Sequence, residues 1–194
     1  MFSVLVLVIF NFTLDLSTDE ALELGAGFLW VAFAFAGILS LNRSFALERE
    51  EGCSYGIALA PVDRGAVYIG KLLANVIFMF VTELIVLPLF AIFFNVGIGA
   101  HFGLLVLILF LGSLGFASVG TMFSAIASHT RMREVMLPVL LLPITIPVLL
   151  AAVETTAFAL GARDSASFWF KLLVVYDLVF VVVCFMTFDY VLQE

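Results

Sequence analysis

The segment LLANVIFMFVTELIVLPLFAIFF, residues 72–94, decides the fold class of this chain. It carries a single ionisable residue, Glu83, and it is longer than the roughly 20 residues that an apolar helix needs to cross a bilayer. The whole chain has the same character, because 64% of its 194 residues are hydrophobic and only 12% are charged. Soluble domains have about 45–50% apolar and about 25% charged residues. The sequence therefore predicts an all-α, polytopic membrane protein.

Working outward from this segment, the chain contains six apolar segments. They cover, approximately, residues 2–14, 25–41, 72–94, 102–127, 135–159 and 168–188. The last five are long enough to span a bilayer. The first is too short and begins at the initiator Met without flanking charges, so we expect the chain to start inside its first transmembrane helix. We find no internal repeat, and we predict a single transmembrane domain over residues 1–194 with a long loop at about 42–70.

The basic residues predict the orientation of these helices. Six of them share one side of the membrane: Arg43, Arg49, Arg64, Lys71, Arg131 and Arg133. Only Arg163 and Lys171 lie on the other side. Because positively charged loops stay in the cytoplasm, we expect the 42–70 loop and both termini there. Trp30 and Trp169 then fall at the outer ends of their helices, where amphipathic rings prefer to lie.

The 42–70 loop is far longer than a turn between two helices. Phe45 and Leu47 alternate with dense charge at residues 48–51, and a short apolar patch ends at Pro61. Asp63 is placed to cap the helix that enters the next span. We expect two short interfacial helices here. Taken by themselves, the residues leave two interpretations open: a docking surface for a cytosolic partner, or an amphipathic loop lying on the lipid headgroups.

The segment GAVYIGK, residues 65–71, fits the first seven positions of a phosphate-binding P-loop. Leu72 stands where that motif needs a magnesium-binding hydroxyl, so we reject the match and predict no nucleotide site in this chain. We find no catalytic triad, paired-carboxylate site or metal-ligand spacing, and we expect no enzyme activity. The net charge of −7 lacks the clustered basic surface of a nucleic-acid-binding protein.

Three carboxylates lie within the predicted spans: Glu83, Glu154 and Asp177. Glu83 follows Lys71 by about 18 Å of helix, which places it near the membrane midplane. Carboxylates at this depth are costly, and they either line a functional path or bond between helices. We predict bonding between helices, and substrate contact is the alternative. The candidate partners are Asn75, Thr82 and Tyr176.

Two further patterns concern helix shape and packing. Pro138, Pro143 and Pro147 each remove a backbone donor, so residues 135–159 are predicted to form a kinked or broken helix. This helix is either a moving, pathway-lining element or a statically bent packing helix. Small residues recur every fourth position in residues 102–127, at Ser113, Ala117, Thr121 and Ala125, with Gly112 and Gly120 beside them. They predict a close helix–helix interface, within one subunit or between two.

Four stretches of the chain carry a family resemblance. They are FALEREEG at 45–52, LAPVDRGAVYIGKLLAN at 59–75, TELIVLPLFAIFFN at 82–95, and the segment from GSLGF to LLAAVE at 112–154. Together they resemble the haem exporter permeases of cytochrome c maturation, the CcmB family, which have the ABC-2-type exporter permease fold. Members of that family normally begin with a basic amphipathic helix, which is absent here.

The resemblance implies a transporter subunit in a bacterial-type inner membrane. It implies a separate ABC ATPase subunit that binds ATP, a second copy of this chain, a haem-handling membrane subunit and a haem chaperone. Haem would be cargo rather than a bound cofactor, and no metal ligand is expected in this chain. His101, in an outer loop, is either a weak candidate for meeting haem iron or has no ligand role. The residues implied to dock the ATPase are Phe45, Glu48, Arg49, Glu50, Glu51, Tyr55, Leu59, Pro61 and Arg64.

Several functions remain open after this comparison. The subunit would either export haem or release a haem-loaded chaperone from its membrane partner. An ABC-2-type permease for a lipid, polysaccharide or drug is one alternative, and a non-transporting membrane scaffold of an assembly complex is another.

Overall fold

The computed structural model describes residues 2–13, 18–50, 64–97, 101–128 and 133–191, and these form six helices and no strand. The helices are α1 (Phe2–Thr13), α2 (Thr18–Glu50), α4 (Arg64–Phe93), α5 (Phe102–Ser128), α6 (Arg133–Ala159) and α7 (Ser167–Val191). All except α1 are long and apolar enough to cross a membrane, whereas α1 has 12 residues. The predicted all-α, polytopic architecture is confirmed.

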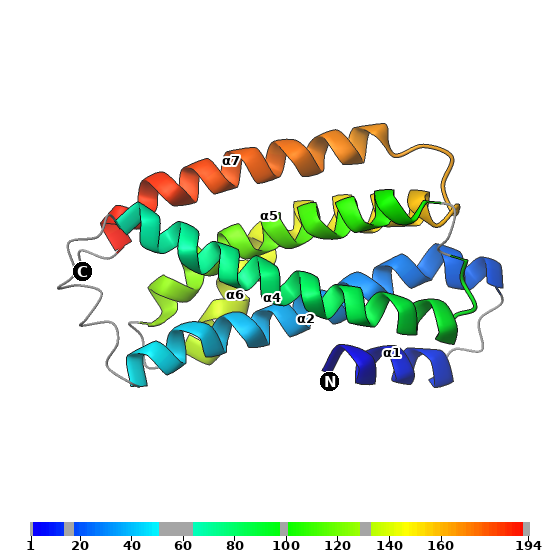
Figure 1. Cartoon of the computed structure of the whole chain (residues 1–194), viewed down its shortest axis with the longest axis horizontal. Coiled ribbons are helices and arrows are strands. Elements are labelled where there is room, and N and C mark those ends of the chain that lie inside the picture. Colours follow the sequence, from blue (N-terminus) through cyan, green and yellow to red (C-terminus); the bar gives the residue numbers. More distant parts are fainter. Residues whose placement is uncertain (1, 14–17, 51–63, 98–100, 129–132, 192–194) are drawn as a thin grey trace.

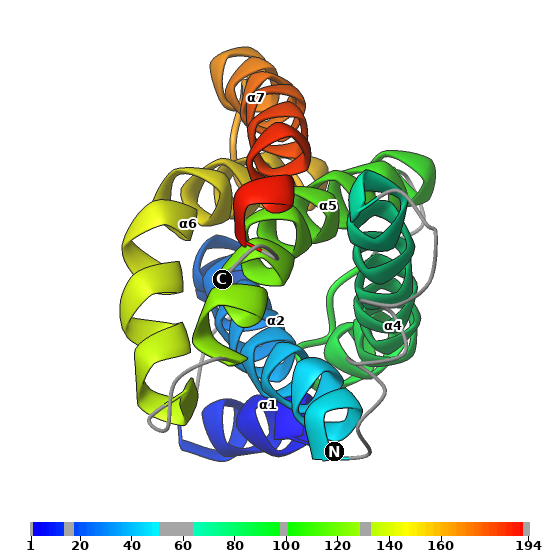
Figure 2. The same ribbon diagram turned by 90° about the vertical axis from the view of Figure 1, so that its left-hand side faces the viewer.

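The helices run roughly along the long axis of the bundle, with α2 and α6 tilted away from it, and α1 lies beside one end of the bundle only (Figures 1 and 2). The end of α2, the start of α4 and the end of α7 all lie at the opposite end of the bundle, where the start of α4 and the end of α7 are neighbours and the end of α2 lies apart from them. Seen along the bundle, α5 lies among its neighbours (Figure 2) and contacts α2, α4, α6 and α7. The two buried carboxyl groups described below both lie against this helix.

The small residues of α5 explain how four helices approach it. Ser113, Ala117, Thr121 and Ala125 are all fully buried, and Gly112 and Gly120 lie against Trp30 and Leu41 of α2. The interface predicted from their spacing is thus confirmed, and the structure shows that these residues pack within the subunit.

Trp30 differs from its prediction. Its side chain is only 2% exposed, and Nε1 donates a hydrogen bond to Thr156 Oγ1 of α6 over 2.9 Å. The indole ring occupies the space that Gly112 leaves open. The buried Thr156 hydroxyl accepts the hydrogen bond from the indole N–H. The indole therefore packs inside the bundle instead of facing the lipid, at a level where its partner Thr156 lies one turn from the end of α6. Trp169 is half-buried and packs against the core.

The boundaries of α2 and α4 also differ from the prediction. The acidic residues Asp19, Glu20 and Glu23 lie in the first turns of α2 rather than in a loop, and α2 continues to Glu50. The prediction of the first interfacial helix is therefore wrong, because residues 43–50 continue the transmembrane helix α2. This segment contains no Gly or Pro, so nothing in it breaks the helix where hydropathy falls. The second predicted helix and Asp63 lie outside the described residues.

Residues 135–159 were predicted to form a kinked or broken helix. A break is wrong, because α6 continues through Pro138, Pro143 and Pro147, and a kink at these residues stays a prediction. Hydroxyl groups supply extra donors along this stretch. Thr145 Oγ1 donates to the Leu141 carbonyl over 3.0 Å, and Tyr176 Oη of α7 donates to the Ile144 carbonyl over 3.0 Å. These two bonds tie α6 to itself and to α7, but they go to carbonyls other than those of Glu134, Val139 and Pro143, which lose their intrahelical donor to the prolines.

Candidate functional site

Glu83 of α4 lies deep in the bundle with 1% of its side chain exposed. Ser113 Oγ of α5 donates a hydrogen bond to Glu83 Oε2 over 2.6 Å, while Oε1 has no partner among the described residues. The prediction that Glu83 bonds between helices is confirmed, but the predicted partners are wrong. Asn75 Nδ2 instead donates to Thr121 Oγ1 over 3.0 Å, and Thr82 bonds to its own helix.

Asp177 of α7 is also buried, with 4% exposure, but neither of its oxygens bonds to any described residue. Its carboxyl group lies against Gly115 of α5, where only a residue without a side chain leaves room. Tyr176 is not its partner, because that hydroxyl donates to α6. For Asp177, the prediction of bonding between helices is wrong within the described part of the chain.

The two carboxyl groups meet α5 at nearly the same depth. Ser113 and Gly115 are two residues apart, which is about 3 Å along a helix and roughly 200° around it. Glu83 and Asp177 therefore flank α5 from opposite sides, near the middle of the spans Gly65–Phe93 and Ser167–Phe188. Sequence reasoning found both acids but missed Ser113 and Gly115 as their contacts. The small-residue pattern on α5 marked the correct helix without identifying which residues meet the acids.

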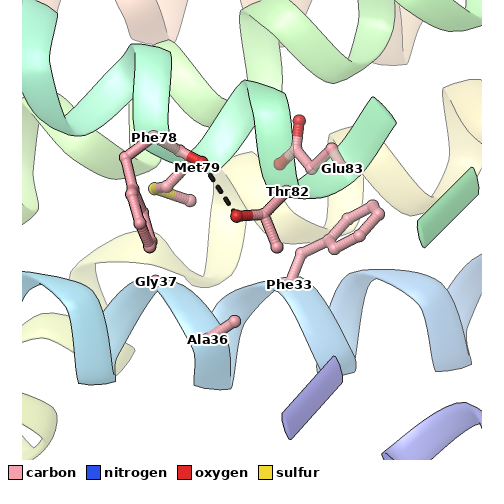
Figure 3. A pocket seen from close by; sticks show the side chains of 7 residues that line it. All are labelled: Phe33, Ala36, Gly37, Phe78, Met79, Thr82 and Glu83. Carbon is pink, nitrogen blue, oxygen red and sulfur yellow. Dashed lines mark hydrogen bonds between the residues drawn. The ribbon is translucent and has the colours of Figure 1, made fainter. Parts of the chain in front are cut away.

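A small cleft opens between α2 and α4 beside this region (Figure 3). Its lining consists of Phe33, Ala36 and Gly37 from α2, and Phe78, Met79, Thr82 and Glu83 from α4. Thr82 Oγ1 donates to the Phe78 carbonyl over 2.9 Å, so that its hydroxyl is satisfied within α4 (Figure 3). The cleft is therefore almost wholly apolar, and Glu83 is its one ionisable lining residue.

The remaining predicted residues lie apart from this region. Glu154 forms an ion pair with Arg163, with 3.4 Å between Oε2 and Nε, and both side chains are partly exposed. Exposed pairs of this kind contribute little to stability. His101 is exposed at the start of α5. The described residues contain no group of three His, Cys, Asp or Glu side chains that could hold a metal ion.

Some of the predicted docking residues lie within the described part of the chain. Phe45, Glu48, Arg49 and Glu50 lie in the last turns of α2, and Arg64 is the first residue of α4. The other docking residues lie outside the described part of the chain: Glu51, Tyr55, Leu59 and Pro61. Residues 65–71 form the first turns of α4, which is a helix rather than the loop that a P-loop requires.

Comparison with known proteins points to one family over most of the chain. The family model described as CcmB protein matches residues 1–192. Heme exporter protein B of Rhodobacter capsulatus is 33% identical over 132 residues, which is 68% of this chain and 60% of that relative. Heme exporter protein B of Pseudomonas aeruginosa is 28% identical over 77% of this chain and 67% of the relative. The Bradyrhizobium diazoefficiens protein of the same name is 24% identical over 94% and 82%.

Proposed function

Because this chain belongs to the CcmB protein family, we propose that it is the permease subunit of an ABC transporter that serves cytochrome c maturation. The relatives are named heme exporter protein B, and the chain is a helical protein with five helices able to span a membrane. We propose that residues 1–194 act as one transmembrane domain, that two copies pair with two ATPase subunits, and that a haem-handling subunit and a haem chaperone complete the system.

One observation carries the mechanistic part of this proposal: the unbroken length of α2. Its membrane span is Leu24–Arg43, yet the helix continues to Glu50. Seven more residues add about 10 Å of helix beyond the span. The charged segment from Glu48 to Glu50 is therefore the end of a transmembrane helix rather than part of a separate loop.

This continuity gives a direct route for mechanical coupling. In the proposed mechanism, an ATPase that binds the 45–64 segment moves the end of α2 when it closes on ATP. Because α2 contacts α1, α4, α5 and α6, displacement of the helix shifts most of the bundle. The result would be export of haem, or release of a haem-loaded chaperone by the partner subunit.

The proposal is tested by copurification. The chain is expressed with its genomic neighbours, purified in mild detergent, and compared with a variant carrying Glu48→Lys, Glu50→Lys and Glu51→Lys. A P-loop ATPase should copurify with the natural sequence, and most of it should be lost from the variant, because attraction between charged surfaces becomes repulsion. Haem-handling proteins in the same preparation would support haem export or chaperone release over another cargo.

The matched control reverses three acidic residues at the opposite end of the same helix: Asp19→Lys, Glu20→Lys and Glu23→Lys. These changes alter net charge equally but lie at the opposite end of α2, on its proposed outer side, so the ATPase should remain bound. Equal loss from both variants would show that the reversal acts through folding. Retention of the ATPase in both, or its absence from the natural preparation, would contradict the docking proposal and favour a scaffold.

A further inference from the structure

We propose that Tyr68 couples the docking segment to the rest of the bundle, because it fixes the first turns of α4 to α5 and to the end of α7. The inference rests on the proposed function, since it concerns how movement of the 45–64 segment reaches the membrane helices. Tyr68 is not one of the predicted docking residues, which end at Arg64.

Tyr68 lies one turn into α4, directly after the docking segment. Arg64 is the first residue of α4, and Tyr68 follows it by about 6 Å of helix. The start of α4 lies beside the end of α7 in both views of the bundle (Figures 1 and 2). A displacement of the docking segment therefore reaches the level of Tyr68 through a single turn of continuous helix.

The Tyr68 side chain ties α4 to α5. Its exposed fraction is 0%, and Oη donates a hydrogen bond to the Ser118 carbonyl of α5 over 3.1 Å. A buried hydroxyl that loses its acceptor costs free energy. The bond therefore holds the first turns of α4 at one position on α5, and the two helices move together at this end.

The same side chain ties α4 to the end of α7. The Tyr68 ring packs on the Phe188 ring with 5.1 Å between centroids, and the Cys184 thiol lies beside the Tyr68 hydroxyl. One turn earlier in α4, Gly65 lies against Phe185 of α7, where a Cβ atom would be 2.7 Å from Cε2. The absence of a side chain at Gly65 lets the start of α4 approach α7 closely. Tyr68 therefore joins three helices at the end of the bundle where the docking segment meets α4.

The contacts of Tyr68 lead to the position of Asp177. Ser118, whose carbonyl accepts the Tyr68 bond, donates its own hydroxyl to the Gly115 carbonyl over 2.9 Å. The Asp177 carboxyl lies against Gly115. On α7, Cys184 follows Asp177 by about 10 Å of helix. A shift of Tyr68 thus moves both the helix that carries Asp177 and the helix on which Asp177 packs.

The alternative is that Tyr68 is a static packing residue. Coupling predicts that the ATPase stays bound while the output of the transporter falls, whereas packing predicts that output falls only as far as stability does. Tyr176 is the matched control for this distinction. It also donates its hydroxyl to a backbone carbonyl of another helix, that of Ile144 over 3.0 Å, but it joins α7 to α6 away from the docking segment.

The test uses the full chain expressed with its genomic neighbours in cells that lack their own cytochrome c maturation system. Two quantities are measured: the ATPase that copurifies, with its rate of ATP hydrolysis, and the amount of cytochrome c with attached haem, from haem-dependent peroxidase staining. In Tyr68→Phe the ring contacts remain and only the bond to Ser118 is lost. We expect the ATPase to be retained and the haem-containing cytochrome c to fall about fivefold, the factor that corresponds to the net contribution of one hydrogen bond.

A second pair of variants tests the contact with α7. Phe188→Leu removes the ring that packs on Tyr68, and it should lower the output without releasing the ATPase. Its control, Phe180→Leu, removes the ring that stacks on Tyr176 at 4.2 Å. We expect Tyr176→Phe and Phe180→Leu to leave both measured quantities near the natural level. SDS-induced unfolding should show equal losses of stability in Tyr68→Phe and Tyr176→Phe, since each variant loses one bond.

Three results would overturn the assignment while leaving the proposed function intact. Equal loss of output in Tyr68→Phe and Tyr176→Phe would show that output follows stability. Natural output in both Tyr68→Phe and Phe188→Leu would show that movement does not pass through Tyr68. Release of the ATPase from Tyr68→Phe would place this residue in the docking surface. Absence of the ATPase from the natural preparation is a separate failure, because it contradicts the proposed function itself and this inference with it.

Discussion

The two sides of α5 hold buried carboxyl groups in different ways. On the side of α4, Ser113 donates to Glu83, and Asn75 bonds to Thr121 at a different turn of the same interface. On the side of α7, Asp177 packs against Gly115 without a bond to any described residue. Both carboxyl groups have 4% exposure or less, so burial does not distinguish them.

This difference indicates which of the two carboxyl groups stabilises the helix bundle and which is the better candidate for a functional role. Bonds between helices hold α4 against α5, and they explain why polar residues are present there. An unpaired carboxyl group near the membrane midplane costs free energy and gains nothing from its surroundings. We therefore infer that the α4 side of α5 is a fixed interface, and that Asp177 is the stronger candidate for a residue that acts when the helices move.

The largest effect is expected from filling the space that Asp177 uses. In Gly115→Ala the new methyl group would overlap the Asp177 carboxyl and lie 2.8 Å from Val148 Cγ2. Overpacking of this kind costs about 1–3 kcal/mol of unfolding free energy. The measurement is SDS-induced unfolding followed by the loss of helical circular dichroism.

The matched control is Gly70→Ala in α4, where a Cβ atom meets nothing within 4 Å. Helix propensity should make that variant slightly more stable, by at most about 1 kcal/mol. If Gly115→Ala is as stable as Gly70→Ala, α7 is not packed tightly on α5, and the contrast between the two sides disappears.

A smaller effect is expected from replacing each acid by an apolar residue of similar volume. Asp177→Val removes an unpaired group, whereas Glu83→Met also removes the acceptor of the Ser113 hydroxyl. The first variant should therefore unfold at higher SDS, with a difference of about 1 kcal/mol, the typical net value of one hydrogen bond. Equal stabilities, or a less stable Asp177→Val, would show that Asp177 has a stabilising partner and would remove the contrast.

Much of this architecture could be predicted from the sequence. Spans of more than 20 apolar residues require helices in a bilayer, because no other local structure satisfies their backbone groups. The four-residue spacing of Ser113, Ala117, Thr121 and Ala125 identified the interface helix, since that spacing places residues on one face. Glu83 and Asp177 were identified as unusual by depth alone.

The features that the sequence did not predict were missed for separate physical reasons. Hydropathy reports where a helix leaves the lipid, not where it ends, so the continuation of α2 to Glu50 was missed. The burial of Trp30 was missed because the sequence does not show that Thr156, far along the chain, offers an acceptor. Pairing across helices depends on their relative rotation and depth, which is why Ser113 was not identified as the partner of Glu83.

The smallest effect concerns the second bond on the α4 side, between Asn75 and Thr121. A double-mutant cycle with Asn75→Ala and Thr121→Val should give a coupling of about 0.6 kcal/mol, the average for such bonds in a membrane protein. The control cycle pairs Asn75→Ala with Thr187→Val, because Thr187 Oγ1 bonds to the Val183 carbonyl of its own helix over 2.7 Å. That cycle should be additive, since the two residues share no partner. Coupling in the first cycle alone would establish that the Asn75–Thr121 bond adds to the Ser113–Glu83 bond and to the bond of Tyr68 with the Ser118 carbonyl on the α4 side. Asp177 has no such bond to a described residue on the α7 side. Additivity in both cycles would mean that the Asn75–Thr121 bond contributes nothing to stability, and that the polar stabilisation of the α4 side comes from the Ser113–Glu83 bond and from the bond of the Tyr68 hydroxyl to the Ser118 carbonyl.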